Sequence, residues 1–242
     1  MEAYPYCGPP PVPSDWFSAW NLDPYLIAGL VVVSLSGALW VRRQQRLEDQ
    51  AGRGRAFAVA LAAAVLAFLS PLCAMTVALF AARSLHHLVI IGLLAPALAL
   101  AVPLRRVRVA PCFLALSAAV WLWHVPQVYS AAWDHAQIYW ALQAALLLPA
   151  WGFWSTVLHR SDLAHVVWLI PLVGQMGLLG ALLTFAPHPF YLEHLAHTER
   201  FGLSALQDQQ LAGLIMWVPG MVPIAVLGGI MGWRLLRTEL RQ

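Results

Sequence analysis

Three histidines have the residue type and the spacing for metal chemistry. His86 and His87 stand side by side near the start of the apolar run 84–103, and His124 follows in Trp-Leu-Trp-His-Val-Pro at the end of the next apolar run. A run of this length can span a bilayer. Ionisable groups inside a membrane are costly, so they pair with groups on neighbouring helices and mark functional sites. We therefore expect His86 or His87 to approach His124.

The adjacent pair cannot serve one centre equally. Consecutive residues of a helix point about 100° apart, because one turn holds 3.6 residues. One of the two histidines should face the interior of the bundle, and the other a loop or a different helix. Which of them would be the ligand stays open at this point.

Copper is the first candidate for such a site. Imidazole suits copper, zinc and iron, whereas thiolate and thioether ligands select Cu(I). Cys73 and Met75 follow the preceding apolar run and are expected at the same membrane face. Two alternatives remain: haem held by two histidines of facing helices, and polar interfacial residues whose imidazoles bond to backbone or water.

Four further polar residues need partners in or near hydrocarbon: Gln175, Asp208, Gln209 and Gln210. They would either support the histidine site or cap and tether helices, and the structural role is favoured. The remaining histidines on the same side are expected to be solvated loop residues; they are His135, His188, His194 and His197.

The composition is that of a polytopic membrane protein. Of 242 residues, 61% are hydrophobic and only 10% are charged. The net charge of +3 does not indicate nucleic-acid binding, because the arginines cluster in short loops. No nucleophile–base pair or phosphate-binding loop occurs, so we predict no enzyme. Three scattered cysteines, Cys7, Cys73 and Cys112, do not predict a disulfide framework.

Hydropathy predicts an all-α fold with seven transmembrane helices. The spans are expected near 25–41, 56–72, 85–102, 110–125, 137–158, 165–186 and 209–233. Residues 1–24 are predicted to be an extramembrane tail, and residues 25–242 a single transmembrane domain.

The arginines predict the orientation. Twelve fall in loops 42–55, 103–109 and 159–164 and after the last span, whereas the other side has only Arg83 and Arg200. Cytoplasmic loops carry the excess of positive charge, so we place the N-terminus outside and the C-terminus in the cytoplasm. The candidate site then lies at the outer face of the cell inner membrane, in contact with lipid.

Four ordered motifs resemble one known family. They are His86-His87 followed by Pro96, the Trp-Leu-Trp-His-Val-Pro run at 121–126, the run from Gln175 to Pro187, and Leu-Gln-Asp-Gln-Gln-Leu-Ala-Gly-Leu-Ile-Met-Trp-Val-Pro at 206–219. Together they resemble the polytopic CtaG family of cytochrome c oxidase assembly factors, over roughly residues 55–236. The chain does not resemble the single-anchor copper chaperones of the same name.

The resemblance implies a role in maturing a haem–copper terminal oxidase, with handling of its copper as the expected activity. Oxidase subunits or other assembly factors would be the partners. The alternative functions are a haem-binding redox membrane protein and an assembly scaffold that binds no metal. The pattern of the family falls on His87, His124 and Asp208-Gln209-Gln210.

Overall fold

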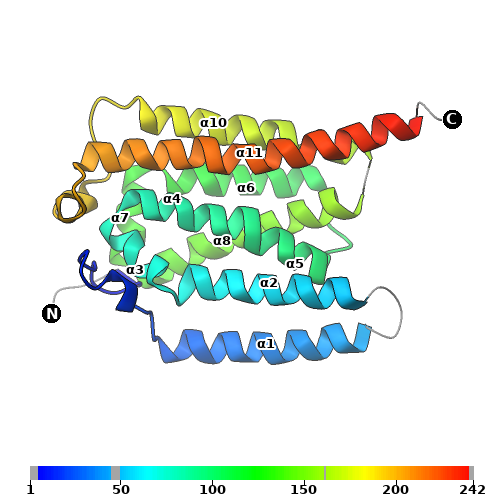
Figure 1. The fold of residues 1–242 in the computed structure, drawn as a ribbon, viewed down its shortest axis with the longest axis horizontal. Helices are drawn as coiled ribbons and strands as arrows, with labels where there is room; N and C mark the ends of the chain where they lie inside the picture. Colours follow the sequence, from blue (N-terminus) through cyan, green and yellow to red (C-terminus); the bar gives the residue numbers. More distant parts are fainter. Residues whose placement is uncertain (1–4, 45–49, 161, 240–242) are drawn as a thin grey trace.

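The computed structural model describes residues 5–44, 50–160 and 162–239 and confirms the all-α class. Within these ranges the chain forms helices and no strand. The long helices lie roughly parallel or antiparallel to one another in one bundle (Figure 1). Of the arginines that predict the orientation, Arg46 and Arg241 lie outside the described residues.

The helices follow the predicted spans closely. The long ones are α1 (Pro24–Gln44), α2 (Gln50–Phe68), α6 (Val109–Trp123), α8 (Ala136–His159), α10 (Leu169–Thr184) and α11 (Ala205–Glu239). The short ones are α3 (Pro71–Ala78), α4 (Phe80–Val89), the π-helical η2 (Ile90–Leu94), α5 (Ala95–Ala101), α7 (Pro126–Asp134) and α9 (Leu163–Val166).

Among the described residues, six helical segments are long and apolar enough to cross a membrane, and there are seven if the bent pair α6–α7 forms one span. The two parts of that pair meet at 79°. Pro126 is the first residue of α7, where its missing N–H costs nothing, and it prevents α6 from continuing straight. The segment before α1 and the end of α11 lie at opposite ends of the bundle in Figure 1, as an odd number of crossings requires.

The histidine helix starts earlier than the sequence predicts. Ser70 caps α3 through a hydrogen bond to the N–H of Leu72, so α3 extends the second span to Ala78. The next span then begins at Phe80 instead of at residue 85. His86 and His87 therefore lie about two turns inside their span, at a rise of about 1.5 Å per residue, and not at its first turn.

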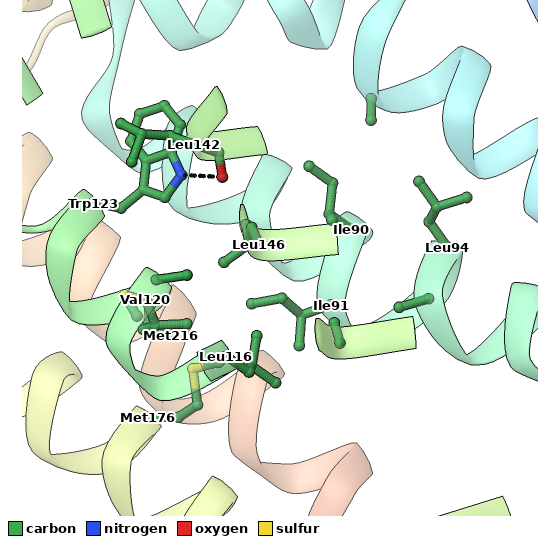
Figure 2. Close-up of a cluster of buried hydrophobic side chains, with 14 of the residues drawn as sticks. Ile90, Ile91, Leu94, Leu116, Val120, Trp123, Leu142, Leu146, Met176 and Met216 are labelled. Atoms are coloured by element: carbon green, nitrogen blue, oxygen red, sulfur yellow. Dashed lines mark hydrogen bonds between the residues drawn. The ribbon is translucent and has the colours of Figure 1, made fainter. Parts of the chain in front are cut away.

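The core lies where the span of α4, η2 and α5 packs against α8 and faces α6. Ile90, Ile91, Leu116 and Leu146 are fully buried there, together with Trp123 (Figure 2). The indole N–H of Trp123 donates to the carbonyl oxygen of Leu142 at 3.3 Å. This core positions the end of α6, and with it His124.

The N-terminal tail is fastened to the bundle by one disulfide, which the scattered cysteines did not predict. Cys7 is disulfide-bonded to Cys73, with their Cα atoms 5.3 Å apart. The two cysteines are 66 residues apart in sequence, but α1 and α2 form a hairpin that returns the chain to the same end. Tyr6 also donates to Asp23 at 2.7 Å. Residues 1–4 of the predicted tail lie outside the described part.

Candidate functional site

His87 and His124 meet at the end of the bundle that holds the tail. His87 is on α4 and His124 directly follows α6. Their ring centroids are 6.2 Å apart, and the Trp123 ring lies 4.7 Å from that of His87. Nδ1 of His124 is hydrogen-bonded to the carbonyl oxygen of Val120 at 2.7 Å, which fixes the direction of the ring and leaves Nε2 as its second nitrogen.

His86 points elsewhere, as the helical geometry requires. Its ring packs edge-on against Phe68 of α2 at 5.4 Å, and its centroid is 5.8 Å from that of His87. The side chain is fully buried. Of the adjacent pair, His87 is thus the one that faces His124.

These histidines carry unused polar atoms. Both ring nitrogens of His86 and Nε2 of His87 are buried without a hydrogen-bond partner in the described part of the chain. Buried polar atoms without partners are rare in native proteins and call for an explanation such as an ion or a water. No group of three or more His, Cys, Asp or Glu side chains within the described ranges could hold a metal ion together. The candidate site therefore provides two candidate imidazole ligands, those of His87 and His124.

Arg83 adds a buried positive charge one turn before the histidines. Its guanidinium lies 5.5 Å from the ring centroids of both Trp123 and Tyr139, and 5.9 Å from that of Tyr129. The side chain is only 4% exposed. Aromatic rings on several sides stabilise the cation through their quadrupoles. Reasoning from the sequence missed Arg83, although an arginine three and four residues before two histidines on one helix was a visible signal.

Asp208, at the start of α11, holds the beginning of α4. Its two carboxylate oxygens accept the backbone N–H groups of Phe80 at 2.6 Å and Ala81 at 3.1 Å. The chain breaks between α3 and α4 at Leu79, so these donors have no partner within α4 itself. A fully buried carboxylate from another helix replaces the usual cap. The favoured structural role of Asp208 matches this geometry.

The neighbouring glutamines have different surroundings. Gln209 accepts the N–H of Phe190 at 2.7 Å and donates to the carbonyl oxygen of His188 at 3.4 Å, so it tethers the loop 187–204. Gln210 accepts from Thr184 only through its backbone carbonyl oxygen. The amide atoms of Gln175 are buried without a partner among the described residues.

The loop 187–204 folds over the site, and the prediction that His194 is solvated is wrong. Two 3₁₀ turns, η3 (Leu192–His194) and η4 (Thr198–Phe201), direct His194 inward, where it is 1% exposed. Its Nε2 is hydrogen-bonded to the Tyr129 hydroxyl at 2.7 Å. Burial, with the nearby charge of Arg83, lowers the pKa of His194 to about 3. His135 and His188 are exposed, as predicted, and His197 is half-buried.

Tyr191 connects this loop to the backbone of His124 and to the start of α4. Its ring stacks on Phe80 at 3.8 Å, and its hydroxyl donates to the carbonyl oxygen of His124 at 3.0 Å. Ser130 and Glu193 form a second hydrogen bond between α7 and the loop. The loop is thus hydrogen-bonded to His124 and to α7, and it packs on the first residue of α4 through Tyr191.

The two predicted sulfur ligands occupy other roles. The sulfur of Cys73 is bonded to that of Cys7 and so is not a thiolate in this structure. The spacing that suggested a soft ligand arises from a cross-link of the tail. Met75 is half-buried on α3, on the other side of the break at Leu79 from the histidines.

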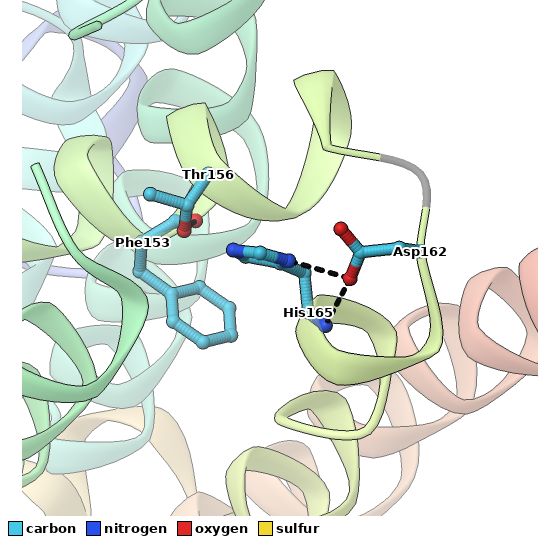
Figure 3. Close-up of polar contacts among 4 residues, drawn as sticks. All are labelled: Phe153, Thr156, Asp162 and His165. Carbon is cyan, nitrogen blue, oxygen red and sulfur yellow. Dashed lines mark hydrogen bonds and ion pairs between the residues drawn. The ribbon is translucent and has the colours of Figure 1, made fainter. Parts of the chain in front are cut away.

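The opposite end of the bundle has a polar contact of a different kind. The Asp162 carboxylate accepts from the backbone N–H of His165 at 3.0 Å and is paired with its ring Nδ1 at 2.6 Å (Figure 3). Phe153 and Thr156 of α8 lie beside that ring in Figure 3. Asp162 is exposed, and the contact caps the short helix α9.

One comparison with known proteins gives a match. A family model described as cytochrome c oxidase caa3 assembly factor (Caa3_CtaG) matches residues 107–238, more than half of the chain. The matched part includes His124, Gln175 and Asp208–Gln210, whereas His86, His87, Cys73 and Met75 precede it. No curated protein and no solved structure matches the chain.

Proposed function

Since the chain belongs to the family of cytochrome c oxidase caa3 assembly factors, we propose that it serves oxidase assembly by binding a copper ion between His87 and His124 and passing it to an oxidase subunit. The observation that carries the proposal is the approach of the two imidazoles from neighbouring helices to 6.2 Å, with Nε2 of His87 unused. The ion is cargo, and the protein acts as a carrier and not as an enzyme.

The separation of the rings suits a single ion. A point midway between the centroids is half of 6.2 Å from each, so a ring-edge nitrogen can reach it with a bond of about 2 Å. A porphyrin between the same rings would have to displace Trp123, which is packed 4.7 Å from His87 and is 1% exposed. The geometry therefore favours a bare ion over haem.

The positive charge of Arg83 favours binding of Cu(I) over Cu(II). Any cation at the histidines is repelled by this buried guanidinium, and the repulsion doubles from Cu(I) to Cu(II). Imidazole accepts copper in either state. With Cys73 in a disulfide, selection of Cu(I) would rest on this repulsion instead of on a thiolate.

The position of the site supports delivery on the outer side of the inner membrane. The arginine partition predicts that the histidine end faces outward. Disulfides such as Cys7–Cys73 persist in oxidising, extracytoplasmic compartments, which supports this orientation. The loop 187–204, bonded to the site through Tyr191, would have to open for the ion to be passed on. The partners would be oxidase subunits or other assembly factors.

A paired set of variants tests the proposal. We expect the purified protein, loaded with Cu(I) under anaerobic conditions, to bind copper stoichiometrically, and the double variant His87→Ala, His124→Ala to bind none while still inserting in the membrane. Oxidase assembly in cells should fail in parallel. The control is His135→Ala, His188→Ala, which removes two exposed histidines at the same end. Copper content equal to that of wild type, together with normal oxidase, in the double variant of His87 and His124 would refute the proposal. A stoichiometric Soret band in the purified wild-type protein would indicate that it binds haem instead of copper.

A further inference from the structure

A second site lies at the opposite end of the bundle. It is a pocket of about 460 Å³, between the last turns of α1, the first turn of α2 and the connection from α5 to α6. Its lining consists of Trp40, Arg53, Pro103, Leu104, Arg105, Arg106 and Val107. Three arginines on two separate parts of the chain thus share one pocket.

The described residues bring no carboxylate to the lining of this pocket. The single ion pair found in ranges 5–44, 50–160 and 162–239 joins His165 to Asp162, so none of the lining arginines has a carboxylate partner there. Arg53 is half-buried, while Arg105 and Arg106 are exposed. Like charges gathered without a counter-ion raise the local potential and attract an anion.

The pocket lies beside the ends of three candidate spans, so we expect it at the depth of lipid headgroups. The spans Pro24–Arg43, Gly52–Ala78 and Phe80–Ala101 all have an end beside it. Trp40 lies at the end of the first, as is usual for tryptophan at a membrane interface.

The wall of the pocket is held in place by α8. The indole N–H of Trp151 donates to the carbonyl oxygen of Val102 at 2.9 Å, and the backbone N–H of Leu104 donates to the Ser155 hydroxyl at 3.2 Å. Arg105 and Arg106 follow directly on this anchored segment. The site is therefore largely formed before any ligand arrives, which lowers the cost of binding.

We propose that this pocket binds the phosphodiester headgroup of an anionic phospholipid. The arginines would take the phosphate oxygens by charge-assisted hydrogen bonds, and the apolar side chains of Trp40, Leu104 and Val107 would cover the glycerol and the first acyl carbons. Basic pockets between spanning helices hold acidic lipid headgroups for the same physical reason. The site is separate from the histidines, so it stands whether or not copper binds at the other end.

The test uses the purified full-length protein in nanodiscs. In phosphatidylcholine discs doped with phosphatidylglycerol, we expect the protein to retain phosphatidylglycerol through gentle delipidation, read by native mass spectrometry. Each arginine near an anionic headgroup contributes roughly one kcal/mol, so the triple variant Arg53→Gln, Arg105→Gln, Arg106→Gln should bind it about a hundredfold more weakly. The matched control is Arg43→Gln, Arg108→Gln, Arg160→Gln, which removes the same charge from exposed residues outside the lining and should bind like wild type.

Three results would overturn the proposal. Equal retention by the two triple variants would show that only net charge matters. Equal retention of phosphatidylcholine and phosphatidylglycerol would show that the charge of the headgroup does not determine which lipid binds in the pocket. Displacement of the lipid by inorganic phosphate alone would assign the pocket to a soluble anion.

Discussion

Arg83 and the pair Arg105, Arg106 show how differently the two ends of the bundle treat charge. Arg83 is buried among three aromatic rings at the histidine end, whereas Arg105 and Arg106 stand exposed at the other end. The histidine end also buries Asp208, His86 and His194. Burial of polar groups in a membrane protein is costly and is retained where it serves a function. The comparison therefore separates an end that buries charged and polar side chains from an end whose arginines stand exposed.

The largest effect on stability should come from the carboxylate that caps α4. Asp208→Leu leaves the N–H groups of Phe80 and Ala81 buried without an acceptor. At about 1–3 kcal/mol for each orphaned donor, the loss is about 2–6 kcal/mol. Thermal unfolding in detergent, followed by tryptophan fluorescence, measures it. Asp134→Leu removes an exposed carboxylate at the same end, and an equal drop in its melting temperature would contradict the capping role.

The second largest loss of stability should follow from removal of the disulfide that fastens the tail. Cys7→Ser with Cys73→Ser opens a loop of 66 residues, whose closure entropy corresponds to about 4 kcal/mol; we expect about 2–4 kcal/mol because the spans stay inserted. The melting temperature should fall to the value that wild type shows in reductant. Cys112→Ser, the free cysteine, should leave that response to reductant intact. Alkylation of Cys7 and Cys73 in the folded protein without reductant is the result that excludes the bond.

Acid should weaken the histidine end selectively. The pKa of His194 is lowered from 6.5 to about 3 in the folded protein, so between these values the unfolded chain binds the extra proton and stability falls as the pH falls. At pH 5 the loss from this residue is about 2 kcal/mol, at 1.36 kcal/mol per pH unit.

The variant His194→Gln keeps a partner for Tyr129 but does not titrate, so its melting temperature should fall less than that of wild type between pH 7 and pH 5. His135→Gln, an exposed change at the same end, serves as the control. Identical acid slopes for wild type and His194→Gln would mean that His194 is not buried as described.

The smallest effect is expected at the opposite end. The hydrogen bond with His165 lowers the pKa of Asp162 below its usual value. The substitution Asp162→Asn weakens this contact. Because Asp162 is exposed and α9 has only four residues, we expect a shift of the melting temperature smaller than in the three cases above. A shift as large as that of Asp208→Leu would remove the contrast between the two ends.

The spans were predictable because hydropathy acts over whole helices. Predicted span 137–158 became α8 (Ala136–His159), and predicted span 165–186 became α9 and α10. The early start of the histidine span was not predictable, because it depends on Asp208 reaching across from α11 to stabilise a break at Leu79. A helix start supported by a distant residue leaves no local signal.

Part of the candidate site was predictable from the pattern of the helices, and part was not. The approach of His87 to His124 follows from helical periodicity and from the hairpin of two spans. Cys73 was misassigned because its partner Cys7 lies beyond two helices in a segment without hydrophobic pattern. The burial of His194 depends on the fold of a loop, for which neither hydropathy nor periodicity is informative.

The bond from Asp208 to Phe80 also sets an order in time. The two residues are separated by 128 positions, which a ribosome takes on the order of ten seconds to add. During that interval α4 carries its histidines in the membrane with its first N–H groups uncapped. The histidine end is complete only when α11 has been inserted, so a nascent chain lacks the finished arrangement until the ribosome has passed Asp208 and the helix that carries it.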